Sequence, residues 1–158
     1  MITGLKPRGF VWVVANRLAV SDRIGGSSFQ HRRVRREEEI NWLVNEAGIT
    51  TVVNLLLGHP NQHSYASAGL TTLECPIEGK PSGAEIDQIY AVLDSAQSEK
   101  GARVLVHRET VDDVVAGLMG GYLIHKGILE DPIVAVAVVQ EIVGEPIGPD
   151  GRAIISRQ

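Results

Sequence analysis

Short apolar segments of strand length alternate along this chain with longer segments in which apolar residues recur at helical spacing. Thr50 to Leu57 and Arg103 to His107 are strand candidates of this kind, and a helix candidate that follows Ser82 lies between them. Continuous apolar runs of this length favour buried strands, and their alternation with helices is typical of an α/β sheet that helices cover. The pattern therefore predicts an α/β fold, with ligand sites where a strand runs through a loop into a helix.

Local signals place the ends of several elements. Ser82 and Glu85 form a capping-box pattern at the start of one helix, Gly48 ends another, and Asp131 followed by Pro132 opens the last. The other predicted strands are Phe10 to Val14, Arg17 to Val20 and Leu70 to Ile77, and the predicted helices are Arg35 to Ala47, Ser82 to Ser98, Val114 to His125 and Ile133 to Val143.

Residues 1–158 are expected to form a single domain, with a core over about residues 10–143 and an irregular tail over 144–158. The tail contains Pro and Gly throughout, and the polar stretch Gly58 to Ala68 is predicted to be a loop. The helix Ile133 to Val143 is apolar almost all round, which favours a core helix. A partly exposed dimer surface is the alternative interpretation of that helix.

The composition is that of a globular protein, with 44% apolar and 22% charged residues. A net charge of −4 speaks against non-specific nucleic-acid binding, which normally needs a basic excess. The single cysteine, Cys75, cannot form an intrachain disulfide, and no apolar stretch reaches the roughly 18 residues of a membrane span. We therefore expect a cytoplasmic protein without a membrane partner.

The segment VLVHRETVDDVVAGLMGGYLI, from Val104 to Ile124, resembles the signature of dual-specificity (tyrosine-phosphatase-like) phosphatases. In that family a strand ends in His and is followed by Cys, two residues, Gly, two residues, Arg, Ser or Thr, and a helix. Three further segments resemble the family in the same order, so that the likeness covers most of residues 10–127. They are Leu18 to Arg36, GITTVVNLL (Gly48 to Leu56) and CPIEGKPSGAEI (Cys75 to Ile86).

The resemblance implies a mixed, mainly parallel central sheet flanked by helices, and it implies that the catalytic loop is degenerate. The position of the nucleophilic Cys holds Arg108, that of the loop Gly holds Val111, and that of the phosphate-binding Arg holds Val114. The general-acid Asp falls near Gly79, where Glu78 is the nearest carboxylate. The degenerate loop comprises His107, Arg108, Glu109, Thr110, Val111, Asp112, Asp113, Val114 and Val115.

The acidic residues of this loop predict that its own carboxylates bind the free amides at the start of the following helix. Thr110 as N-cap with Asp113 three residues later resembles a capping box, and it would place a carboxylate where a phosphate would bind. We therefore predict a pseudophosphatase, a binding, regulatory or scaffolding module without a cofactor. Two alternatives stay open: an enzyme with altered chemistry at this loop, using His107 or the carboxylates of Asp112 and Asp113, and a purely structural, oligomer-forming domain.

A basic run precedes three consecutive glutamates, Glu37 to Glu39, and is a second candidate contact region. It could bind a phosphorylated ligand, RNA or an acidic partner, or its arginines could pair with nearby acids. The predicted partners are another protein, a phosphorylated ligand or a second copy of the chain, with nucleic acid disfavoured. The candidate contact residues are His107 and Arg108 of the loop together with Arg32, Arg33, Arg35 and Arg36 of the run, which begins at His31.

Two further candidates have simpler interpretations. His59 and His63 are four residues apart, which suits zinc in a helix, but Pro60 and the polar context predict a loop and no third ligand is near. No metal is therefore expected. Cys75 precedes Pro76 on a different segment from the loop, and it is expected to be a small buried hydrophobe rather than a replacement nucleophile.

Overall fold

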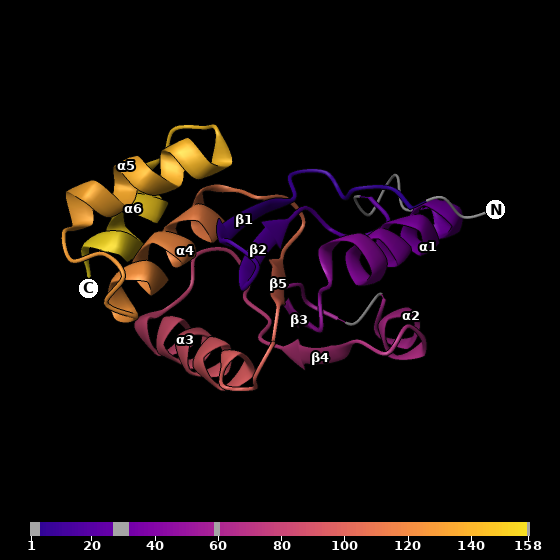
Figure 1. The fold of residues 1–158 in the computed structure, drawn as a ribbon. Coiled ribbons are helices and arrows are strands. Elements are labelled where there is room, and N and C mark those ends of the chain that lie inside the picture. Colours follow the sequence, from indigo (N-terminus) through magenta and orange to yellow (C-terminus); the bar gives the residue numbers. More distant parts are fainter. Residues whose placement is uncertain (1–3, 27–31, 59–60, 158) are drawn as a thin grey trace.

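A single five-stranded sheet lies at the centre of the molecule (Figure 1). The computed structural model describes residues 4–26, 32–58 and 61–157. The strands are β1 (Val11–Val14), β2 (Leu18–Ser21), β3 (Thr51–Asn54), β4 (Thr71–Glu74) and β5 (Val104–His107), in the spatial order β1-β2-β5-β3-β4. β1 runs antiparallel to β2, and all other neighbours are parallel. The mixed, mainly parallel sheet is therefore confirmed.

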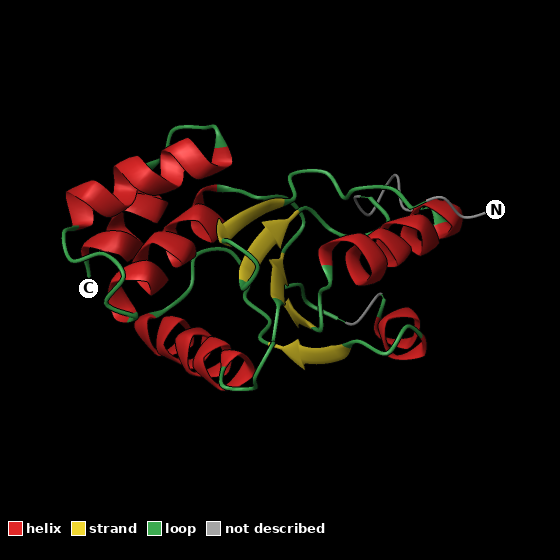
Figure 2. Cartoon of the chain, in the orientation of Figure 1, coloured by secondary structure: helices red, strands yellow, loops and turns green. Residues whose placement is uncertain are grey.

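Helices cover both faces of this sheet, which gives three layers (Figure 2). On one face lie α1 (Arg33–Trp42), its π-helical continuation η1 (Leu43–Ala47) and α2 (Gln62–Ser67). On the other face lie α3 (Gly83–Gln97) and α4 (Asp113–His125), and α5 (Pro132–Val143) and α6 (Pro149–Ser156) pack against α4. α1 and α2 thus stand at the opposite end of the molecule from α5 and α6 (Figure 1).

Alternate side chains of the central strand supply the two halves of the core. Val104 and Val106 of β5 pack with residues of α3 and α4, whereas Leu105 between them packs with residues of α1 and η1. Successive side chains of a strand point to opposite faces, so a strand covered on both sides must be apolar throughout. This explains the continuous apolar run that predicted β5.

The predicted helix boundaries are confirmed where capping chemistry marks them. The Ser82 hydroxyl accepts a hydrogen bond from the Glu85 amide at 3.1 Å, and the Glu85 carboxylate accepts one from the Ser82 amide at 2.9 Å. Asp131 caps α5 through the Ile133 amide, and Gly48 follows η1 in the left-handed region at φ 71°. These are local interactions, which is why local sequence predicts them.

Two predicted irregular segments contain helices. The stretch expected to be a loop, 58–68, contains α2. The buried ring of Tyr65 packs this helix against the half of the core that contains Leu105. The tail expected to be irregular holds α6, which begins at Pro149 and buries Ile154 and Ile155. Pro at the first turn followed by a pair of isoleucines was the available signal for α6. The strand prediction for Thr50 to Leu57 was also too long, since Asn54 turns the chain by accepting a hydrogen bond from the Leu56 amide.

The helix Ile133 to Val143 was expected to be a core helix, but one side of α5 is exposed, so that expectation is wrong for this side. Only Ala135 and Val139 of α5 are fully buried, and the side chains of Ile133 and Val134 are 80% and 45% exposed. The reason is that α5 packs mainly on the outer side of α4 and meets the sheet chiefly at its edge strand β1. Among the described helices, α5 included, none is long and apolar enough to cross a membrane.

Candidate functional site

The loop of residues 108–112 joins β5 to α4 at the carboxyl end of the parallel strands. Ser21 of β2 and Asn54 of β3 both pair in register with His107, the last residue of β5, so three strands end together beneath the loop. All three end residues are buried. Open α/β sheets place ligand sites at this edge. The predicted segment His107 to Val115 therefore occupies the position where a site is expected.

Arg108 is tied to two other parts of the loop region. Its Nη2 donates a hydrogen bond to the carbonyl oxygen of Gly79 at 2.8 Å, and its Nη1 lies 3.3 Å from Oδ2 of Asp112. The side chain is only 14% exposed. At the position that the resemblance gives to a nucleophile, the chain thus has a cation that connects the loop to the segment expected to carry a general acid.

Two backbone amides near the start of α4 are already bound to carboxylates of the protein. The Val111 amide donates to Oδ1 of Asp22, and the Val115 amide donates to Oδ1 of Asp112, both at 2.9 Å. We predicted that carboxylates of the loop bind the free amides at the start of α4. This holds for Asp112, but the predicted N-cap residue was wrong. Asp112 is the N-cap instead of Thr110, because its carboxylate reaches the amide three residues later.

Asp113, which the sequence placed in the capping box of α4, caps a different helix. Its carboxylate accepts hydrogen bonds from the Gly148 amide at 2.6 Å and the Gly151 amide at 3.0 Å. These amides lie at the start of α6, where a negative charge is favourable. Asp113 therefore links the loop to the C-terminal helix and is not free for binding or catalysis.

The three valines of the loop and helix start belong to the apolar core. Val114 and Val115 are 7% and 0% exposed and lie in the cluster between the sheet, α3 and α4, and the half-buried Val111 packs against that cluster. In the related signature these positions hold Gly, Arg and Ser or Thr, which surround an anion. Apolar side chains at these positions remove the donors of such a clamp.

A groove of about 340 Å³ remains beside the loop. Its charged side chains are Arg23, Glu78, Arg108 and Glu109, two of each sign. Nη1 of Arg23 lies 3.5 Å from Oε2 of Glu109, while Nε of Arg23 has no hydrogen-bond partner in the described part of the chain. The groove is thus open, but most of its positive charge is balanced within the protein.

His107 is buried beneath the loop, with 1% of its surface exposed. Its Nε2 lies 3.1 Å from the hydroxyl of Tyr65, which also accepts a hydrogen bond from Nδ2 of Asn61. Nδ1 has no hydrogen-bond partner among the described residues. The backbone of Arg108 favours the protonated ring and offsets part of the effect of burial on the pKa of His107. Burial lowers the pKa of His107 to about 4, so the ring is neutral at pH 7 and does not face the groove as an acid.

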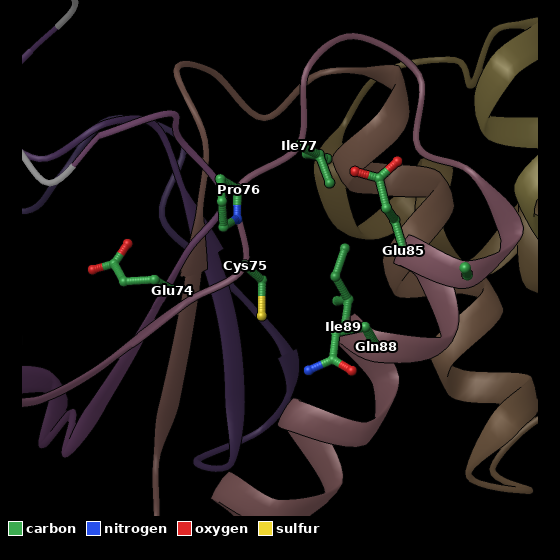
Figure 3. Close-up of a pocket in the computed structure, with 8 residues that line it drawn as sticks. Glu74, Cys75, Pro76, Ile77, Glu85, Gln88 and Ile89 are labelled. Carbon is green, nitrogen blue, oxygen red and sulfur yellow. The ribbon is translucent and has the colours of Figure 1, made fainter.

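Cys75 lines a separate pocket of about 290 Å³ between β4 and α3. Figure 3 shows its sulfur directed toward Gln88 and Ile89 of α3, whereas the carboxylate of Glu74 points away from them. Burial raises the pKa of the Cys75 thiol, so that the thiolate is disfavoured. The thiol lies 7% exposed in the apolar core, as expected for a small buried hydrophobe, and it does not reach the loop groove.

The arginines of the basic run differ in the residues that they contact. Nε of Arg35 lies 2.9 Å from Oε2 of Glu39, which is buried and also binds the Gly25 amide. Arg33 pairs with Glu37 at 3.0 Å on the surface. Arg32 is exposed at the N-cap of α1, and Arg36 is half-buried. The arginines of this run are therefore not equivalent, and His31 lies outside the described residues.

The metal prediction can be tested only in part. His63 lies on α2, contrary to the predicted loop, and His59 lies outside the described residues. Over 4–26, 32–58 and 61–157, no group of three or more His, Cys, Asp or Glu side chains is arranged to hold a metal ion.

Asp22 and Tyr65 are the site residues that the sequence did not reveal. Asp22 follows β2 and is separated from the Val111 amide by 89 positions, so no local pattern connects them. Its position after a strand that ends beside β5 was the only available signal. Tyr65 lay in a segment that was expected to be a loop.

Solved structures share this fold at low sequence identity. No protein-family model matches the chain, and no curated protein matches its sequence. Kinase associated phosphatase, with serine in place of its catalytic cysteine, superposes with a TM-score of 0.76 at 15% identity over 95% of this chain and 93% of that one. Tk-PTP in the active form gives 0.72 at 16% identity over 94% of each chain.

A third comparison extends the likeness. The core catalytic domain of the PP-IP phosphatase SIW14 from S. cerevisiae, in complex with citrate, gives a TM-score of 0.71 at 12% identity, over 98% of this chain and 87% of that one. Identities this low establish the architecture, and the activity of these proteins does not transfer with it.

Proposed function

We propose that this chain, whose fold is that of tyrosine and dual-specificity phosphatases, is a catalytically inactive module that binds and regulates a partner. The observation that carries the proposal is Arg108, which stands at the nucleophile position and is held by Gly79 and Asp112. Covalent phosphoryl transfer needs a thiolate, a cluster of anion donors and an acid. Val114 replaces the donor, and the Asp22 and Asp112 carboxylates occupy two amides.

The wild-type protein should therefore release no p-nitrophenol above the blank from p-nitrophenyl phosphate. Loss of a nucleophile alone commonly lowers turnover by at least ~10³-fold, and here the anion clamp is lost as well. Initial rates should be compared with those of an active phosphatase of the same fold at equal concentration. Turnover that exceeds the blank and persists in the Arg108→Ala variant would reveal a working site elsewhere and would contradict the proposal.

Altered chemistry at the loop receives less support. His107 is neutral, 1% exposed and bonded to Tyr65, so it does not reach a substrate in the groove. The Asp112 and Asp113 carboxylates bind backbone amides of α4 and α6. The groups named for such chemistry thus have structural partners.

The exposed side of α5 supports a second candidate function, self-association. Ile133 and Val134 are exposed there, and Ile128, just before the helix, is 55% exposed. Exposed apolar residues gathered on one helix are typical of an interaction surface. For a scaffold of this kind, light scattering should give a molar mass near twice the monomer's 17.1 kDa, and Ile133→Glu should return it to the monomer. A wild-type monomer at high concentration would exclude this role.

A further inference from the structure

A pocket of about 490 Å³ lies between α1 and α2. We call it the α1–α2 pocket, and its lining residues are Arg33, Arg36, Glu37, Ile40, His63, Ser64, Ser67 and Ala68. It shares no residue with the groove beside the loop. α1 and α2 lie next to each other in Figure 1, on the face of the sheet away from α3 and α4. The α1–α2 pocket is therefore a separate site from the degenerate loop.

Arg36 is the cation of this pocket that has no counter-charge among the residues that the structure describes. Its Nε is inaccessible to solvent and has no hydrogen-bond partner, and within the described ranges the side chain forms no ion pair. The two neighbouring arginines that have partners, Arg33 and Arg35, bind Glu37 and Glu39. A buried guanidinium donor without an acceptor is costly, and an anion in the pocket would remove that cost.

The other polar groups of the α1–α2 pocket also suit an anion. Ser64 and Ser67 bring hydroxyls one helical turn apart on α2, and His63 adds an imidazole. Among the described lining residues the one carboxylate is Glu37, and Nε of Arg33 lies 3.0 Å from it. The lining therefore contains two guanidinium groups against one carboxylate, which leaves a net positive charge opposite the hydroxyls.

We infer that the α1–α2 pocket binds the phosphate monoester group of a small organic molecule, with Arg36 as the principal anion contact. A phosphate monoester presents three acceptor oxygens, which match a guanidinium fork and two hydroxyls better than the two oxygens of a carboxylate do. Ile40 and Ala68 provide an apolar wall for the carbon skeleton. The volume lies within the roughly 300–1,000 Å³ of small-molecule sites. The inference does not depend on the inactivity of the loop.

The test is an NMR titration of the ¹⁵N-labelled full chain with inorganic phosphate and with n-butyl phosphate, a monoester whose carbon skeleton is apolar. Both probes should shift amide signals of α1 and α2, and the ester should bind more tightly because it also contacts the apolar wall. Arg36→Gln should weaken binding at least tenfold, and Arg36→Lys should restore part of it. The matched control is Arg32→Gln, which removes the same charge from the same run but from an exposed residue outside the pocket, and it should change affinity less than twofold.

Three outcomes would overturn this inference. One is the absence of a saturable shift with either probe, and another is an equal loss of affinity in the Arg32→Gln and Arg36→Gln variants, which would indicate non-specific attraction. The third is binding that is lost in Arg108→Gln and retained in Arg36→Gln, which would place the anion at the loop. Hydrolysis of p-nitrophenyl phosphate alongside normal binding at Arg36 would instead contradict only the proposed inactivity. The same spectra report whether each variant is folded.

Discussion

The free energy of unfolding should fall by about 3 kcal/mol between pH 6.5 and pH 4 through the titration of His107 alone. The ordinary pKa of 6.5 is lowered to about 4 in the folded protein, mainly because the ring is fully buried. Between these values the unfolded chain binds a proton at this residue and the folded chain does not. Stability contributed by the neutral ring is therefore complete above pH 6.5 and is lost as the pH falls toward 4.

The measurement is urea unfolding of the wild type and of His107→Gln at several pH values in this window. Glutamine retains an acceptor near the position of Nε2 for the Tyr65 hydroxyl but cannot be protonated. Between pH 6.5 and pH 4, the free energy of unfolding should therefore fall much less in this variant than in the wild type. His63→Gln is the matched control, since it makes the same substitution at an exposed histidine. Parallel slopes in all three proteins would show that His107 does not carry the effect.

Gly117→Ala should lower the free energy of unfolding by about 3 kcal/mol, although alanine normally favours a helix. A Cβ atom at residue 117 of α4 would lie 2.5 Å from the Cα of Gly151 and 2.7 Å from its carbonyl oxygen. Backbone atoms cannot rotate away as a side chain can, so α6 has to move. Displacement of α6 removes burial from Ile154 and Ile155, each worth roughly 1.5–3 kcal/mol when complete.

Gly83→Ala provides the control for this substitution. Gly83 is exposed in the first turn of α3, and the nearest atom to its added Cβ is the flexible Arg157 side chain at 3.4 Å. That variant should be unchanged or slightly more stable in urea. Limited proteolysis provides a second readout, because Gly117→Ala should accelerate cleavage within residues 144–157. Equal stability of the two variants would mean that α4 and α6 do not pack as closely as described.

The sequence could predict the parts of this fold that depend on neighbours along the chain. The apolar run of β5 reflects burial on both faces, and the Ser82 and Asp131 caps bind amides two or three residues away. The order and spacing of several partial motifs, from Leu18 to Ile124, indicated the architecture despite the altered loop. For the caps, the interaction and its sequence signal lie within the same few residues.

Interactions between distant segments could not be predicted in this way. Asp113 appeared to cap its own helix, because a carboxylate at a helix start has that role by default, yet it binds amides 35 and 38 positions away. The approach to α6 contains Pro and Gly throughout, and the helix is held by distant residues, through its capping by Asp113 and its close packing on Gly117. Glu39, four residues after Arg35, is a local partner for that arginine, but no local pattern indicates that Arg36 lines a pocket between α1 and α2.

The carboxylate of Asp22 can also be regarded as a competitive inhibitor attached to the protein. It holds the Val111 amide at 2.9 Å and is delivered by a folded strand, so its effective concentration exceeds that of a ligand diffusing in solution. A phosphate approaching the loop would have to displace this tethered competitor before it could contact the Val111 amide. We therefore expect that restoring a cysteine at position 108 alone would not recover catalysis, because the Val111 amide would remain bound to Asp22.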